Sequence, residues 1–256
     1  MKKTIFKTGR LLTVLLTLLI SCFALGDGVS VKDILQKVDD GGYSKSSKIY
    51  MTQTVITPSG DKREFKMVAY SKNGNQQALT QYLAPQQVAG MKILTLNDGD
   101  DIWSYFPRTN RTRKIASSAR NRKVQGSDFT YEDMAQGKMV KAWTGTMKGS
   151  EKLNNNECYK LELTPTSAGP RSYKKAEMFV DKKNFIIHKA IYFDSYGEKF
   201  KELVFDDYKK VSGVWVPYKY IMTNLQDGGK TVVTVANAEI NINLENSLFS
   251  ESSLGS

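Results

Sequence analysis

The pattern of apolar and polar positions changes once along the chain, near residue 46. Before that point, apolar residues between Val31 and Val38 recur at spacings of three and four, which predicts an amphipathic helix. Ser30 and Asp33 have the spacing of a capping box at its start, and the helix is expected to end before Gly41-Gly42. We expect this helix to lie across a sheet or over the mouth of a cavity.

From Ser46 onwards, apolar residues mostly alternate with polar ones, as in half-buried β-strands. Between Arg63 and Tyr70 the alternation places Phe65, Met67 and Ala69 on one face. Two later segments alternate most cleanly, with Val214, Val216, Tyr218, Tyr220 and Met222 on one face of the first and Val232, Ala236, Ala238, Ile240 and Ile242 on one face of the second.

About a dozen strand patterns are joined by short links, so neighbouring strands are expected to pair in antiparallel fashion. That number is too large for a flat open sheet, and strong curvature is expected. The predicted fold class is therefore mainly β, of the α+β type. It is a strongly curved antiparallel half-barrel with the N-terminal amphipathic helix and one short helix covering an apolar concave face.

The short helix is predicted within residues 126–134. Gly126 can adopt a positive φ at no steric cost, and Thr130 stands three residues before Asp133, as in a capping box. Phe129 and Met134 then occupy the positions of a hydrophobic staple, and a helix of about two turns is expected. We expect this segment to close one end of an apolar cavity. A well-capped turn without a ligand role accounts for the same pattern.

The first 26 residues have the pattern of an export signal. Four cations precede an apolar run from Leu11 to about Phe23, which is too short for a spanning helix of about 20 apolar residues. Cleavage after Gly26 would release a periplasmic chain, 27–256, that is expected to form a single domain. Acylation of Cys22 would instead produce a membrane-anchored lipoprotein.

Without the signal, the chain has 33 Lys and Arg against 26 Asp and Glu, a net charge of +7. Seven of the cations lie between Arg108 and Lys123, a segment without acids. A solvated surface explains such a segment, and so does recognition of an anionic headgroup by Arg108, Arg111 and Arg113. Export from the cytoplasm argues against a nucleic-acid partner.

Candidate catalytic and metal-binding groups are few. The single histidine, His188, lies in the middle of a predicted strand, and neither Gly-x-Ser-x-Gly nor a metal-spaced set of His and Cys is present. Asp98, Asp100 and Asp101 resemble part of a calcium loop, but the glutamate at its last position is missing and a hairpin turn explains them better. We expect no metal or cofactor, and an enzyme is disfavoured.

Aromatic and methionine side chains are the candidates for the wall of the cavity, because methionine adapts to more than one ligand shape. Ordinary core packing is the alternative for each of them. The candidate ligand-binding residues are Met91, Trp103, Phe106, Phe129, Met134, Trp143, Phe193 and Trp215.

Residues 126–134, preceded by Trp103 to Arg108 and the arginine-rich segment, resemble the LolA-like outer membrane lipoprotein-sorting proteins. The likeness is to the branch that carries the motif Gly126-Ser127-Asp128-Phe129, and the C-terminal segment from Ala238 to Phe249 is similar as well. The resemblance implies a curved antiparallel half-barrel with helices over its apolar concavity.

In function, the resemblance implies a periplasmic carrier of lipoprotein acyl chains or phospholipid. Its expected partners are an inner-membrane transporter and an outer-membrane acceptor, with transient contact to the membrane surface. A sensor that binds mislocalised lipoprotein or lipid without transporting it is the first alternative. An enzyme acting on a lipid or cell-wall substrate is the second.

Overall fold

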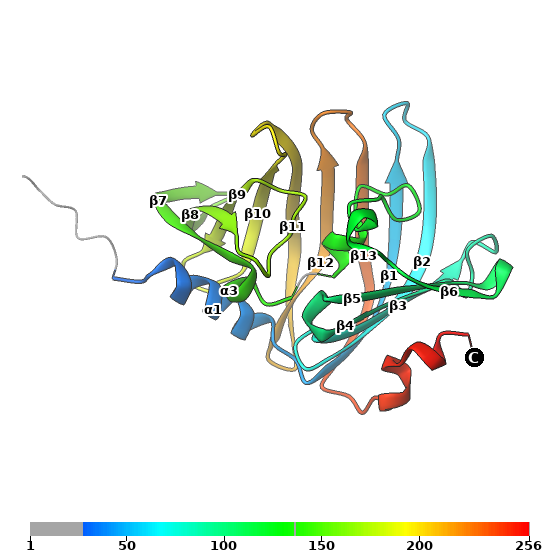
Figure 1. Ribbon diagram of the computed structural model, residues 1–256. Coiled ribbons are helices and arrows are strands. Elements are labelled where there is room, and N and C mark those ends of the chain that lie inside the picture. The colour runs from blue at the N-terminus through cyan, green and yellow to red at the C-terminus, as the bar shows by residue number, and fades with distance from the viewer. Residues whose placement is uncertain (1–27, 136, 256) are drawn as a thin grey trace, which may run out of the picture.

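The computed structural model describes residues 28–135 and 137–255. The expected export signal and Cys22 lie outside these described residues. Within them, thirteen strands form one antiparallel sheet that curves but does not close (Figure 1). The mainly β prediction is confirmed.

The strands alternate along the chain with short links and few helices. In chain order they are β1 (Ser46–Ile56), β2 (Lys62–Lys72), β3 (Gln77–Ala84), β4 (Lys92–Leu96), β5 (Asp101–Phe106), β6 (Arg111–Lys114), β7 (Trp143–Leu153), β8 (Asn156–Pro165), β9 (Lys175–Asp181), β10 (Ile187–Phe193), β11 (Lys199–Val211), β12 (Val214–Asn224) and β13 (Lys230–Ile240). The helices are α1 (Val31–Gly42), α2 (Tyr131–Met134) and α3 (Met139–Ala142), with short 3-10 turns η1 (Asn97–Gly99), η2 (Pro107–Thr109), η3 (Ser117–Ala119), η4 (Asn246–Phe249) and η5 (Glu251–Ser253).

The order of strands in the sheet is β6-β5-β4-β3-β2-β1-β13-β12-β11-β10-β9-β8-β7. Each half of the sheet therefore follows chain order outwards from the central pair, in which β1 pairs with β13 from Ser47–Ile240 to Ile56–Lys230. The short links expected from the sequence join the other consecutive strands. The connection between the two edge strands, β6 and β7, is longer and contains η3, α2 and α3. The central pair therefore joins the first and last strands of the chain, while the edge strands β6 and β7 stay unpaired with each other.

The alternation predicted for β13 is wrong in the first half of the strand. Val232 and Ala236 are expected on the buried face, but Val233 and Val235 are buried there instead, and Ala236 is exposed. The register against β1 shifts between Tyr50 and Met51, which makes Ala236 the extra residue of a β-bulge. Because a bulge changes the phase of the strand, Ala238 and Ile240 beyond it are buried as expected, whereas Ile242, after the end of the strand, is only partly buried.

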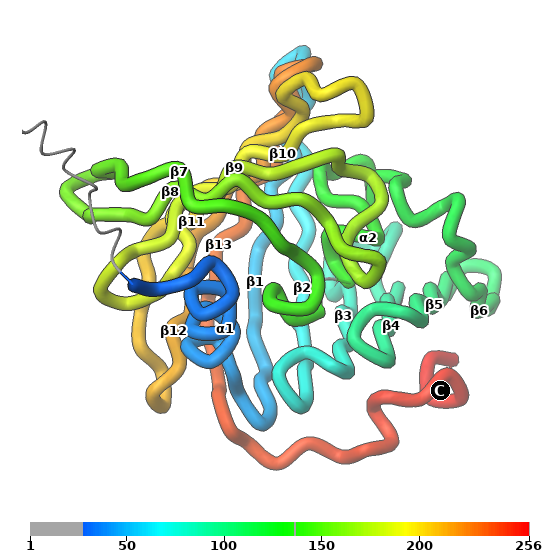
Figure 2. The backbone as a smooth tube through the Cα atoms, turned by 60° about the vertical axis from the view of Figure 1, so that its left-hand side comes forward, coloured from blue at the N-terminus to red at the C-terminus, as the bar shows by residue number. Residues whose placement is uncertain are grey.

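Helix α1 begins with the predicted capping box. The Asp33 N–H donates to the Ser30 hydroxyl oxygen at 3.1 Å, and the Ser30 N–H donates to the Asp33 carboxylate at 3.2 Å. Ile34 and Leu35 are fully buried in a cluster with inward side chains of β8 to β12. The helix contacts β7, β12 and α3, and it crosses the concave side of the second half of the sheet (Figure 2).

The C-terminal segment covers part of the opposite, convex face. Phe249 and Leu254 of this segment are buried with Leu79 of β3 and Leu94 of β4. Both faces of the first half of the sheet are therefore covered in part, the concave one by the segment before β7 and the convex one by the chain end. No helix in the described ranges is long and apolar enough to cross a membrane.

Candidate functional site

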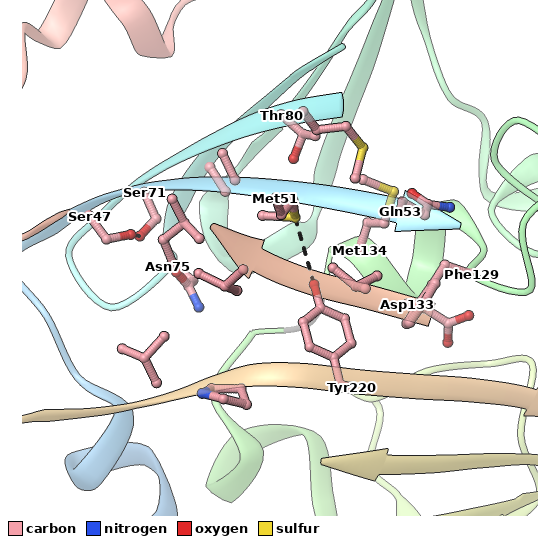
Figure 3. Close-up of a pocket in the computed structure, with 18 of the residues that line it drawn as sticks. Ser47, Met51, Gln53, Ser71, Asn75, Thr80, Phe129, Asp133, Met134 and Tyr220 are labelled. Atoms are coloured by element: carbon pink, nitrogen blue, oxygen red, sulfur yellow. Dashed lines mark hydrogen bonds between the residues drawn. The ribbon is translucent and has the colours of Figure 1, made fainter. Parts of the chain in front are cut away.

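Inward side chains of the central strands line a cavity of about 440 Å³ on the concave side of the sheet (Figure 3). Small-molecule sites typically have volumes of about 300–1,000 Å³. Four methionines contribute to the wall, and aromatic and branched side chains supply most of the rest. The apolar lining residues include Ile49, Met51, Met67, Phe129, Met134, Leu203, Phe205, Val216, Tyr220, Met222, Val233 and Val235.

Residues 126–134, which we call the plug, close one end of this cavity. Gly126 has a φ of +70°, as expected, and a Cβ at this position would lie 2.6 Å from Nη2 of Arg63. Phe129 packs edge to face on Tyr220, with ring centroids 6.0 Å apart, and Met134 lines the cavity from the helix that follows. Both predicted plug side chains therefore face the cavity.

Helix α2 within the plug has the predicted capping box but is shorter than expected. Thr130 and Asp133 exchange the two capping hydrogen bonds, at 2.8 and 3.1 Å. The helix ends at Met134 after about one turn, because Ala135 leaves the helical conformation and its N–H donates to the Glu132 carbonyl. The expected two turns are therefore wrong.

Three carboxylates hold the plug against its surroundings, and Asp128 forms the first of these connections. Its side chain is 3% exposed and accepts hydrogen bonds from the Thr231 hydroxyl on β13 and from Nζ of Lys123, both at 2.9 Å. The Asp128 N–H donates to Thr231 Oγ1 at 2.8 Å. Glu132 makes the second connection by accepting the backbone N–H groups of Arg171 and Ser172 at 2.8 and 3.0 Å.

Asp133 makes the third connection, through a buried ion pair. Its carboxylate lies 2.9 Å from Nζ of Lys201 on β11, and the two side chains are 3% and 1% exposed. The Tyr173 hydroxyl donates to the same carboxylate at 2.6 Å. Burial, followed by the negative charge of Asp133, raises the pKa of Tyr173 well above its ordinary value, so the hydroxyl keeps its proton as a donor.

Sequence patterns missed Lys201 and Tyr173, which lie 68 and 40 residues from Asp133. One signal was present, since Lys201 has the same phase in its strand as Leu203 and Phe205, which point inward. A lysine on the inward face of a strand requires a buried partner. The partner itself is set by the fold and not by local sequence.

Five of the predicted ligand-binding residues lie on the concave side. Phe129 and Met134 line the cavity. Met91 and Phe106 lie outside it, in the cluster that packs beneath Met134. Trp143 is 3% exposed and packs in the core cluster under α1, so it does not line the cavity either.

The other three predicted residues belong to the convex face. Trp103 packs in the cluster under the C-terminal segment, with the Lys114 ammonium 5.5 Å from its ring. The Lys175 ammonium lies 4.4 Å from the centre of the Phe193 ring, and the Lys210 ammonium lies 5.4 Å from the Trp215 ring. The alternating pattern shows which residues of a strand share a face, but it does not show which face of the sheet is concave. The expectation that Trp103, Phe193 and Trp215 line the cavity is therefore corrected.

Arg108, Arg111 and Arg113 are exposed on η2 and on the edge strand β6, and none of them lines the cavity. Their recognition of an anionic headgroup stays a prediction. On β10, the His188 Nε2 atom lies 3.4 Å from the carboxylate of Asp181, which is the last residue of the neighbouring strand β9. In the ranges that the structure describes, no group of three or more His, Cys, Asp or Glu side chains is placed to hold a metal ion.

A family model with the description "Uncharacterized protein" matches residues 74–256, more than half of the chain. None of the curated proteins compared with the chain matches it. Among solved structures, a domain described as an outer membrane lipoprotein-sorting protein from Vibrio parahaemolyticus is 24% identical, covers 88% of this chain and 98% of its own, and has a TM-score of 0.81.

Two further solved structures share the fold over similar lengths. A DUF1329 family protein from Desulfovibrio piger is 23% identical, with coverage of 87% of this chain and 97% of its own and a TM-score of 0.82. A LolA superfamily protein from Nitrosomonas europaea is 20% identical, with coverage of 88% and 99% and a TM-score of 0.71. At these identities the likeness establishes a common fold.

Proposed function

Because the chain belongs to the family whose model matches residues 74–256 and has the fold of LolA-like lipoprotein-sorting proteins, we propose that it carries acyl chains of lipoproteins or related lipids through the periplasm towards the outer membrane. The observation that supports this proposal best is the apolar cavity beneath the plug. Its wall is built from side chains of many strands, so its shape follows from the fold as a whole.

The affinity of such a site would come from burial of apolar chain. Each buried methylene contributes about 0.8 kcal/mol, so about ten of them contribute about 8 kcal/mol before the cost of immobilising the ligand. The four methionines of the wall allow chains of different shape to pack, because the thioether side chain is flexible. Release would be slow without a partner or a movement of the plug.

The remaining parts of the proposal concern location and partners. The export pattern of residues 1–26 supports a periplasmic protein, or one anchored through Cys22 if that residue is acylated. An inner-membrane transporter would load the carrier and an outer-membrane acceptor would unload it, with transient contact to the membrane surface. The carrier performs no covalent chemistry and requires no cofactor.

Substitution of Phe129 tests the proposal. Phe129→Asp places a carboxylate on the wall, and we expect it to weaken binding of a fluorescent acylglycerol by about tenfold or more, because a charge is then buried without a partner. Tyr196→Asp is the matched control, since Tyr196 is 87% exposed in the turn between β10 and β11 and does not line the cavity. Circular dichroism confirms that both variants fold.

Transfer of the same acylglycerol between vesicles separates a carrier from a sensor. The carrier accelerates transfer, a sensor binds the lipid without moving it, and an enzyme changes the mass of the lipid. Equal losses of binding in the two variants would show that the plug is not part of the site. A wild-type protein that takes up no lipid would refute the carrier.

A further inference from the structure

The end of the cavity opposite the plug is polar and lies near the turn between β2 and β3. Figure 3 shows Ser47, Ser71 and Asn75 at the side opposite Phe129 and Met134. The hydroxyl groups of Ser47 and Ser71 are buried and lie 2.7 Å apart. Thr80 and Thr95 also line the cavity. These groups offer hydrogen bonds to a ligand but carry no charge.

No lysine or arginine is among the described residues that line the cavity. The one ionised lining side chain is Asp133, and its carboxylate already accepts hydrogen bonds from Lys201, Tyr173 and Thr130. A carboxylate or phosphate group that lay inside the cavity, away from the exposed Asn75 at its edge, would therefore have no counter-charge among the lining residues. Such burial is costly, whereas a hydroxyl or ester group needs only hydrogen bonds.

Gln53 adds a neutral polar group to the plug side of the cavity. The residue is 5% exposed and lines the cavity close to Met134 (Figure 3). Its Nε2 is buried and has no hydrogen-bond partner among the described residues. Because its side chain is a neutral amide, Gln53 adds a hydrogen-bond donor to the wall without adding a charge that could pair with an anion.

The polar end adjoins a smaller hollow whose lining has more acidic than basic side chains. Asn75 also lines this hollow of about 230 Å³, together with Asp39, Asp40 and Lys138. Helix α1 ends beside this hollow and has no basic residue in its last turn. The negative end of the helix dipole adds to the charges of Asp39 and Asp40, although the Asp39 carboxylate also accepts the N–H groups of Met139 and Val140 at 2.8 and 3.0 Å. An anionic headgroup that protruded here would be repelled.

We propose that the cavity selects lipids whose polar group is uncharged, such as acylglycerols and fatty alcohols, over fatty acids and phosphate-bearing lipids with the same chain. The hydroxyl or ester oxygens bind at the end formed by Ser47, Ser71 and Asn75, and the chain runs towards Phe129 and Met134. This inference rests on the proposed carrier function and specifies the class of ligand.

Chain-matched probes test it. Monooleoylglycerol, oleyl alcohol, oleate and lysophosphatidic acid with an oleoyl chain would each displace a neutral fluorescent acylglycerol from the mature wild-type protein. We expect the two anions to bind about tenfold more weakly than the neutral lipids, or worse. Oleate binding as tightly as monooleoylglycerol would overturn the inference and leave the carrier function standing. Failure of every probe to bind would refute the carrier function as well.

A charge placed at the polar end provides the matched comparison. Asn75→Lys adds a cation beside the expected polar group and should narrow the preference for monooleoylglycerol over oleate by about threefold. Asn73→Lys is the control, because Asn73 is exposed in the same turn, also has a positive φ, and does not line the cavity. An equal change in the two variants would contradict the assignment of the polar end.

Discussion

Substitution of Asp133 by asparagine should release the plug from β11 and leave a buried charge behind. The side chains of Asp133 and Lys201 are 3% and 1% exposed, and their charged atoms lie 2.9 Å apart. Removal of one partner of such a pair costs about 3–5 kcal/mol, because the other charge stays buried and uncompensated. For a domain of this size, that loss lowers the melting temperature by about 6–20 °C.

Urea denaturation measures the free energy of unfolding of the variant and of two comparisons. Asp207→Asn breaks an exposed pair with Lys209, whose side chains are 54% and 51% exposed, and should cost at most about 1 kcal/mol. Asp133→Asn combined with Lys201→Met removes both buried charges, and it should recover most of the loss. Two results would refute the claim that this ion pair stabilises the plug. One is a loss of unfolding free energy no larger than that of Asp207→Asn, and the other is a double variant no more stable than Asp133→Asn.

Three further outcomes are expected. Burial raises the pKa of the Cys158 thiol to about 11, so the folded protein should resist a thiol reagent at neutral pH and react once unfolded; rapid reaction of the folded protein would contradict this. Arg111→Glu with Arg113→Glu should weaken binding to anionic vesicles and leave acylglycerol affinity unchanged, and unchanged vesicle binding would exclude the headgroup role. Gly126→Ala should lower the free energy of unfolding by about 1 kcal/mol in urea, because its φ is positive; no loss would contradict the strain.

Local patterns predicted the local elements well. The capping boxes at Ser30 and Thr130 each depend on a spacing of three residues, and both exist. The alternation also placed Phe65 and Met67 of β2 on one buried face. At Ala236 it failed, because a β-bulge has no marker in the sequence and depends on the pairing of β13 with β1.

The composition of the cavity wall could not be predicted from local patterns. Trp103 and Trp215 have the size expected of cavity residues, but they lie on the convex face under lysine side chains. Both faces of the sheet carry aromatic residues, and alternation does not distinguish them. The partners of Asp133 were hidden for a similar reason, since Lys201 and Tyr173 are 68 and 40 residues away along the chain and meet it only in the folded protein.

Mass spectrometry of the mature protein, purified gently from its own envelope, tests the central claim most directly. The carrier proposal predicts a noncovalently bound lipid or lipopeptide in the wild-type protein and much less of it in Phe129→Asp. A wild-type protein that carries no such molecule, and that takes up neither acylglycerol nor fatty alcohol when these are supplied, would contradict the claim that the cavity binds acyl chains.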